Sequence, residues 1–434
     1  MALSPFRPGS LTRSATDYFV SLRRDMTTLQ RQLQTGQRAD SYGGLGFERR
    51  TSLDIRAKLA AMEGYQSNIE QSDLRIKVMT QHLERLNKLS QDTKADVTLS
   101  KFDLLSDGTT FVQKNAEQRF KEIIDLLNTD IAGRTLFAGR SVDKLPVESY
   151  DRIMNGDGAR AGLKTMIQER TLAELGGAPG TGLGRVQVTS PAAGAVRIEQ
   201  DTAAQPYGFR LDLAGATVTG TAITAAPNAG PPPRFDIAVG ALPAEGDSIT
   251  LRLTDADGAS TTVTLTATTQ PPQPGALTTT FQIGADANAT ATNLQAALTQ
   301  AMKEKAIAVL QPRAAMKTAE EFFAATPSAP PQRLVPPFAT ATTTVPGTAA
   351  NTLIWYNGDD DPAVTARNTA PVRIDQAQVV AAGARASEPA IRNILAQLGV
   401  LAAETFTNSK ADAARYATLS DKVFDKLSGP AIRR

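Results

Sequence analysis

The 434-residue sequence has no cysteine, one histidine and one tryptophan. Without thiols the chain forms no disulfides, thiolate metal sites or cysteine nucleophiles. The lone His82 excludes a histidine metal cluster, and no Ser or Cys nucleophile motif lies near it. We therefore interpret His82 as a solvated or interhelical residue of a long helix and not as a catalytic base.

The sequence also lacks long apolar runs and an excess of one charge. No stretch of 18 apolar residues occurs, and the N-terminus has no apolar signal-peptide core, so neither a membrane span nor a Sec-type signal is predicted. The 46 Lys and Arg residues nearly balance the 44 Asp and Glu residues, which disfavours binding to nucleic acid or anionic lipid. Phosphate-binding, dinucleotide-binding, zinc-protease and hydrolase motifs are absent. We expect no enzyme activity, no catalytic residue, no metal and no cofactor.

The composition changes twice along the chain. A short flexible segment, 1–14, precedes a region at 15–150 that is rich in Gln, Leu, Arg and Glu, as exposed helices are. Residues 151–371 are rich in Thr, Ala, Gly and Pro, and helical composition returns at 372–434. The predicted fold class is α+β: an elongated antiparallel helical rod made by the N- and C-terminal segments, with a mostly β inserted domain.

The first helix carries a heptad-like apolar seam followed by a glycine. We predict that Gly36 ends this helix and that Tyr42–Gly46 is a flexible connection. Further helices are predicted at 51–103 and 108–132, the last with Phe111, Phe120, Ile123, Ile124, Leu127 and Ile131 on one face. The seam residues, which we expect to form an assembly interface, are Ala15, Phe19, Leu22, Met26, Leu29 and Leu33.

The inserted region contains one clear hairpin. Apolar residues alternate at 249–253 and 263–265 around a turn at Asp257-Gly258. Further strands are predicted near 185, 209 and 235, and an amphipathic helix at 291–310. Beyond the insert, Ser387 is expected to cap a helix that carries Ile391 to Leu401, and another helix is expected at 410–427.

The acidic run Asn357 to Asp361 invites a calcium-binding interpretation, because carboxylate oxygens suit this cation. The spacing of an EF-hand loop fails here, since Pro362 occupies its sixth position and Asn368 its twelfth. A solvated turn is the favoured interpretation.

Three phrases carry a resemblance to a known family. The helix ending in Thr35-Gly36 and Arg38 resembles the start of the bacterial flagellin family, and Leu136, Phe137 and Gly139 resemble a signature of its hook–filament junction branch. A third phrase, with Trp355, Tyr356, Gly358 and Asp360, resembles alphaproteobacterial junction proteins.

The resemblance implies a non-enzymatic structural subunit, exported unfolded through the flagellar channel and assembled outside the cell. Its implied partners are copies of itself, a neighbouring hook-associated protein, flagellin, the flagellar export apparatus and an export chaperone. The family normally continues with a last long helix that pairs with the first, whereas this sequence ends at KLSGPAIRR. We therefore expect the C-terminal rod segment to lack the family's last helix.

Two other functions stay open on the sequence alone. Filament flagellin shares the N-terminal phrase. A surface- or glycan-binding module on a helical stalk would use Trp355, Tyr356 and Asp359 to Asp361.

Overall fold

The computed structural model describes residues 9–39, 41–202 and 206–429. They fall into two units. The first comprises residues up to Gln71 with Val372–Val380, and the second comprises Ser72–Pro371 with the residues from Ala381 onward. The fold is α+β, with a helical N-terminal rod and a β-rich domain, as predicted.

The first unit is built from α1 (Gly9–Thr35), the short 3-10 helix η1 (Tyr42–Glu48) and the first part of α2 (Arg49–Leu99). Gly36 has φ +66° and its N–H donates to the Gln32 carbonyl at 2.9 Å, so the predicted helix end is confirmed. Of the segment expected to be flexible, residues 1–8 lie outside the described part and residues 9–14 already belong to α1. Tyr42–Gly46, expected to be a flexible connection, lies within the 3-10 helix η1.

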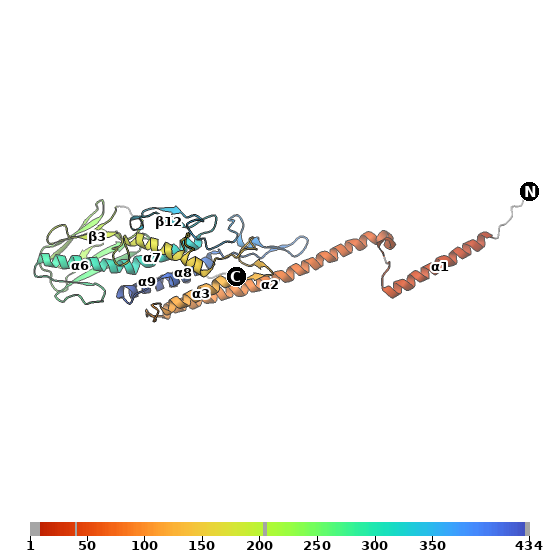
Figure 1. Ribbon diagram of the computed structural model, residues 1–434, viewed down its shortest axis with the longest axis horizontal. Helices are drawn as coiled ribbons and strands as arrows, with labels where there is room; N and C mark the ends of the chain where they lie inside the picture. Colours follow the sequence, from red (N-terminus) through yellow and green to blue (C-terminus); the bar gives the residue numbers. More distant parts are fainter. Residues whose placement is uncertain (1–8, 40, 203–205, 430–434) are drawn as a thin grey trace, which may run out of the picture. The chain divides into compact units, whose positions relative to one another are not determined.

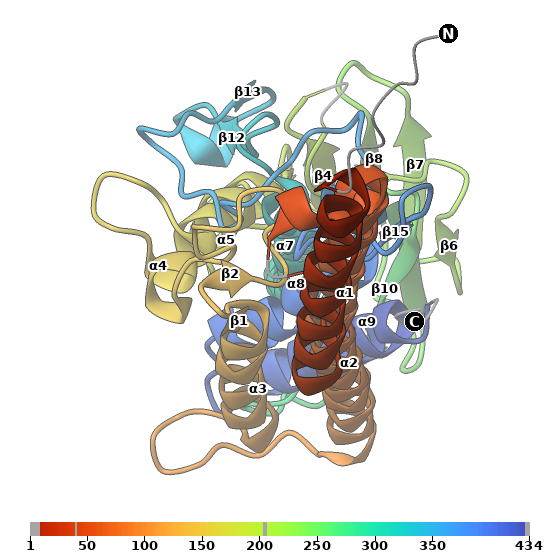
Figure 2. The same ribbon diagram turned by 90° about the vertical axis from the view of Figure 1, so that its right-hand side faces the viewer.

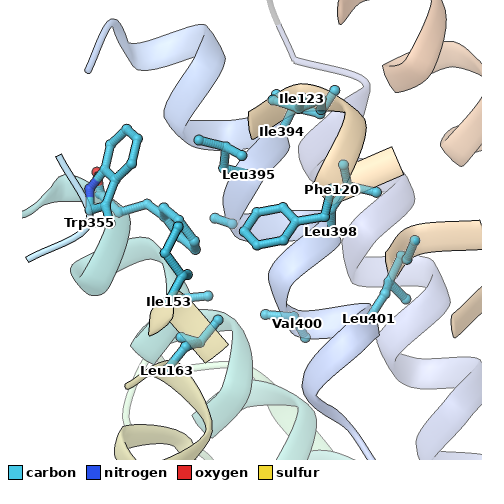
Figure 3. Close-up of a cluster of buried hydrophobic side chains, with 14 of the residues drawn as sticks. Phe120, Ile123, Ile153, Leu163, Trp355, Ile394, Leu395, Leu398, Val400 and Leu401 are labelled. Carbon is cyan, nitrogen blue, oxygen red and sulfur yellow. The ribbon is translucent and has the colours of Figure 1, made fainter. Parts of the chain in front are cut away.

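A helical core occupies one part of the second unit (Figure 3). The end of α2 packs there with α3 (Phe111–Leu127), α4 (Tyr150–Asn155), α5 (Leu163–Leu175), α7 (Gln311–Ala324), α8 (Pro389–Ala403) and α9 (Lys410–Leu427). Phe120 and Phe323 meet edge to face at 5.9 Å between ring centroids, and Trp355 continues the contact at 5.4 Å from Phe323. Such aromatic contacts add to the burial of apolar area and hold the helices together.

The third predicted helix is shorter than expected. It starts after Thr110, whose hydroxyl accepts from the Gln113 N–H while the Gln113 side chain accepts from the Thr110 N–H. Phe111 is therefore at its exposed first position, and the helix ends at Leu127. Ile131 lies in the hairpin of β1 (Asp130–Ile131) and β2 (Arg134–Thr135), because Gly133, at φ +73°, turns the chain there.

A second core lies between two sheets and α6 (Ala287–Lys305). The antiparallel sheet runs in the order β3-β4-β8-β7, and its strands β4, β8 and β7 appear side by side in Figure 2. The other sheet runs in the order β11-β10-β9-β5, with β6 also paired to β9. The predicted hairpin is β9 and β10, paired with Leu251 opposite Val263. The strand bounds are β3 (Val186–Thr189), β4 (Ala195–Gln200), β5 (Arg210–Leu211), β6 (Thr217–Val218), β7 (Ile223–Asn228), β8 (Arg234–Val239), β9 (Ser248–Thr254), β10 (Ser260–Thr268) and β11 (Thr280–Gln282).

Helices of the inserted region connect the two cores. α6 continues through the π-helix η2 (Ala306–Leu310) into α7, and the three are drawn along one line in Figure 1. Neither α5 nor α7 was predicted from the sequence, yet both contribute side chains to the helical core. Arg313 of α7 is paired with the buried Glu174 of α5 and, at 2.7 Å, with Asp257 in the hairpin turn. These ion pairs tie the β9–β10 hairpin to the helices.

The C-terminal helices lie close to the predicted ranges. α8 follows Glu388 and has Pro389 in its first turn, so the expected cap at Ser387 is wrong by one residue. α9 is capped by Ser409, whose hydroxyl accepts from the Asp412 N–H at 3.0 Å. It ends at Leu427, as predicted, and Ser428 is its C-cap residue. Two small strand pairs and two 3-10 turns complete the elements: β12 (Gln332–Leu334) with β13 (Thr344–Pro346), β14 (Pro371–Arg373) with β15 (Val379–Ala381), η3 (Phe338–Thr340) and η4 (Ala366–Thr369).

Candidate assembly interface

The apolar seam of α1 is exposed in the structure. Phe19, Leu22, Met26 and Leu29 are all exposed, and Leu33 reaches 89%. Steps of three and four residues place these side chains on one face of a helix. A heptad seam open to water is unfavourable by itself, so this face is suited to packing against another helix.

The long helix α2 also has an apolar stripe. From Met79 onward most of its members are buried in the helical core, among them Leu86, Leu89 and Val97. Earlier members of the same helix are exposed: Ile55, Leu59, Met62 and Ile69. The helix therefore carries apolar side chains well beyond the part that its own core covers, and this exposed part is a second candidate contact surface.

The second of the three signature phrases, around Leu136 and Phe137, lies at the edge of the helical core. Leu136 and Phe137 are buried, and the Phe137 ring stacks on the His82 ring at 6.3 Å. Gly139 adopts φ +66°, which lets the chain turn away from the core. The Phe137 carbonyl accepts from the Ala386 N–H at 2.8 Å, and the Gly139 N–H donates to the Ala384 carbonyl at 3.2 Å.

His82 belongs to this arrangement as an interhelical residue. Its Nδ1 lies 3.1 Å from the Leu126 carbonyl of α3, and burial lowers the pKa of its imidazole. The sequence-based interpretation as an interhelical side chain agrees with this position.

The third signature phrase is buried in the same region. The Trp355 indole N–H donates to the Phe323 carbonyl at 3.1 Å, and the Tyr356 hydroxyl donates to the Asp359 carbonyl at 3.1 Å. Burial raises the pKa of Tyr356 to about 12. A side chain at Gly358 would collide with the Tyr356 ring, which explains the glycine. Because both aromatic rings are fully buried, the interpretation that Trp355 and Tyr356 serve surface or glycan binding is wrong.

Main-chain hydrogen bonds join the two buried phrases. The Glu148 N–H donates to the Trp355 carbonyl at 2.9 Å, and the Asn357 N–H donates to the Pro146 carbonyl at 2.8 Å. Nearby, the Asp359 N–H donates to the Ala138 carbonyl at 2.9 Å. Residues 136–148, 355–361 and 384–386 thus form one three-part contact, which we call the signature junction.

The acidic run is part of this junction and not a solvated turn as interpreted from the sequence. Asp359 is paired with Arg140 at 2.8 Å and with Arg385 at 2.5 Å, and Asp361 is paired with Arg140 at 2.8 Å. The hydrogen bond from Arg140, and then that from Arg385, lower the pKa of Asp359 to about 2. Asp360 accepts from the Ser328 N–H at 2.8 Å.

These carboxylates are held by protein donors, and within the described residues no three His, Cys, Asp or Glu side chains are grouped to hold a metal ion. Sequence reasoning did not pair Arg140 with Asp359, because 219 residues separate them and no periodicity links their positions.

The remaining signature residues form a local turn. The Thr35 hydroxyl donates to the Arg31 carbonyl at 2.8 Å, and the Gln32 side chain donates to the Arg38 carbonyl at 2.8 Å. The Arg38 guanidinium is ion-paired with Glu48. The phrase Thr-Gly-x-Arg thus shapes the turn from α1 toward η1 and lies outside the signature junction.

Residues 11–142 match the family profile described as the bacterial flagellin N-terminal helical region. The matched range covers most of α1, all of α2 and α3, and the phrase around Leu136 and Phe137. It supports a relationship to the bacterial flagellins, which are a family of structural proteins. Neither the curated proteins nor the solved structures gave a match. No helix in the described part of the chain is long and apolar enough to span a membrane.

Proposed function

We propose that this protein is a non-enzymatic structural subunit of the bacterial flagellum that joins the hook to the filament and thereby supports motility. It acts without a metal or cofactor, by packing against neighbouring subunits. The matched flagellin region supports the structural role, and the exposed seam of α1 carries the proposal, because a polymer of the same chain supplies the helices that would cover it.

The assignment to the junction rests on residue types. Leu136, Phe137 and Gly139 form the phrase that resembles the junction branch of the flagellin family. In support, this phrase packs against the third signature phrase, around Tyr356.

The proposed partners follow from this location. Copies of the same chain pack around the flagellar axis through the rod segments 15–150 and 372–434, while the strands within 151–371 face outward. A hook-associated protein and flagellin lie on either side. The chain reaches this extracellular position through the flagellar export apparatus, with the help of an export chaperone.

Deletion of the gene tests the proposal. Cells are expected to keep their hooks, to lose their filaments and to release flagellin into the medium, which electron microscopy and immunoblotting of the medium would show. Filaments of normal length in the deletion strain would contradict the junction role.

The alternative, filament flagellin, makes a different prediction for the purified protein. A filament subunit forms long filaments at high protein concentration or on seeds, whereas a junction subunit forms short rings. Long filaments from this chain alone would replace the junction proposal with the filament one.

A further inference from the structure

A buried carboxyl group lies at the turn between α8 and α9. Glu404 directly follows the last residue of α8, and its N–H donates to the Val400 carbonyl at 3.2 Å. Its side chain is only 8% exposed. A carboxylate here is disfavoured twice, by the loss of water and by the partial negative charge at the C-terminus of a helix.

The negative charge of an ionised Glu404 is only partly balanced by neighbouring positive charge. Its cationic neighbour is Arg415 of α9, 3.3 Å away. Arg415 also donates to the Gln311 side chain and the Thr405 carbonyl, lies 3.1 Å from Asp412 and stacks over the Phe406 ring. The guanidinium charge is therefore shared among several acceptors and is not reserved for Glu404.

The other elements around Glu404 contribute neutral amide groups and one lysine. α3 contributes the neutral Gln113, which donates to the Glu404 carbonyl at 2.5 Å, and α7 contributes the neutral Gln311. From α5, Lys164 lines the same cavity, and from α9 the charged groups are Arg415 and the acidic Asp412. Burial is the main reason that the pKa of Glu404 rises to about 7, and Asp412 raises it further while Arg415 opposes the rise.

A cavity gives this carboxyl group access to solvent protons. It has a volume of about 450 Å³ and is lined by Glu404 and Arg415, by a face of α5 that includes Lys164 and Gln168, and by Gln311. Release of α9 from the core would remove Arg415 and Asp412 and expose Glu404 to water. Glu404 would then titrate like an ordinary glutamate.

We propose that the turn between α8 and α9 is a proton-operated latch, in which protonation of Glu404 favours the docked position of α9 and loss of that proton favours its release. The docked state binds the proton more tightly than the released state. Docking is therefore strongest below the ordinary glutamate range near pH 4.5 and weakens as the pH rises through 7. Between pH 5 and pH 8 the equilibrium constant for release rises on the order of 50-fold, and above pH 8 it changes little.

Hydrogen exchange of the full chain tests the latch. After correction for the intrinsic rate, the exchange of Tyr416–Val423 in α9 is compared with that of Phe120–Leu127 in α3 from pH 5 to pH 9. The ratio of the α9 exchange rate to the α3 exchange rate is expected to rise about 50-fold up to pH 8 in the parent protein. The Glu404→Gln variant keeps the shape of the side chain but cannot ionise. Its exchange ratio is therefore expected to stay at the low-pH value. Glu63→Gln, at an exposed position of α2, serves as the control and should behave as the parent.

A parent ratio that does not change with pH, or a Glu404→Gln ratio that still rises, would overturn the latch. Should the variant fail to fold, nuclear magnetic resonance of the selectively labelled Glu404 carboxyl in the parent decides the question. A midpoint near pH 7 supports the proposal, and a midpoint near the ordinary glutamate value rejects it.

Discussion

Asp359 accepts a 2.5 Å hydrogen bond from Arg385, and this pair connects the loop after the buried Trp355-Tyr356 phrase to the segment that leads into α8. Both side chains are about nine-tenths buried, at 9% and 10% exposure. A second arginine, Arg140, reaches the same carboxylate from the segment that follows Gly139. One carboxylate thus holds together three segments that lie far apart in the sequence.

Substitution of Asp359 should be much more costly than substitution of Asp361. Asp359→Asn leaves the buried guanidinium of Arg385 without its anionic partner, and we expect a loss of about 3 kcal/mol in the free energy of unfolding. Asp361→Asn removes only a pair with the half-exposed Arg140, which water and salt screen, so its effect on stability is expected to be small. Urea unfolding followed by circular dichroism measures the loss of unfolding free energy in each variant. Equal losses would argue against the central role of Asp359.

The same carboxylate predicts a loss of stability in acid. Because Arg140 and Arg385 lower its pKa from 3.8 to about 2, Asp359 stabilises the folded chain above pH 4, and this contribution disappears as the pH falls toward 2. It amounts to about 2 kcal/mol. The difference in unfolding free energy between the parent and Asp359→Asn should therefore shrink between pH 4.5 and pH 2. A difference that stays constant over this range would contradict the assignment.

Gly139 should tolerate no side chain. An alanine there would cost about 1 kcal/mol for the left-handed backbone at φ +66°, and its Cβ would lie 3.0 Å from the Asp359 Cβ. Gly158→Ala is the matched control, since Gly158 has φ +86° and no atom lies within 4 Å of the place that its Cβ would take. We expect Gly139→Ala to lower the thermal midpoint clearly more than Gly158→Ala. Equal shifts of the thermal midpoint in the two variants would mean that only the backbone conformation, and not the close packing against Asp359, requires glycine at position 139.

A substitution in the seam of α1 should impair assembly without impairing folding. Leu29→Glu places a charge on the exposed apolar face and is expected to abolish polymer formation, measured by sedimentation and electron microscopy, while the thermal unfolding of the second unit is unchanged. Arg24→Glu, two residues from Leu22 and on the opposite side of the helix, serves as the control and should still assemble. Assembly of Leu29→Glu at the parent's rate would remove this face from the interface.

Local patterns in the sequence were sufficient to predict several elements of the structure. The seam of α1, its end at Gly36 and the hairpin of β9 and β10 depend on the spacing of neighbouring residues and on local turn residues, and all three were predicted. The three phrases that indicated a flagellin were also visible, and the N-terminal two lie in the matched range.

The helices α5 and α7 and the roles of Trp355 and Asp359 could not be found in this way. α5 and α7 lie in a region of β-like composition, and tertiary packing of Ile167 and Phe323 in the shared core outweighs that composition. Trp355 and the acidic run resemble a binding loop in isolation, but burial turns the indole into a core residue and the carboxylates into ion-pair partners.

The sequence by itself therefore determined the periodic elements and the apolar seam of α1, because these follow from the order of neighbouring side chains. Only the tertiary structure decided which distant residues meet, such as Arg140 with Asp359 and Glu404 with Arg415, and which of their charges are buried. The physical reason is that burial and ion pairing depend on three-dimensional proximity, which no local spacing rule encodes.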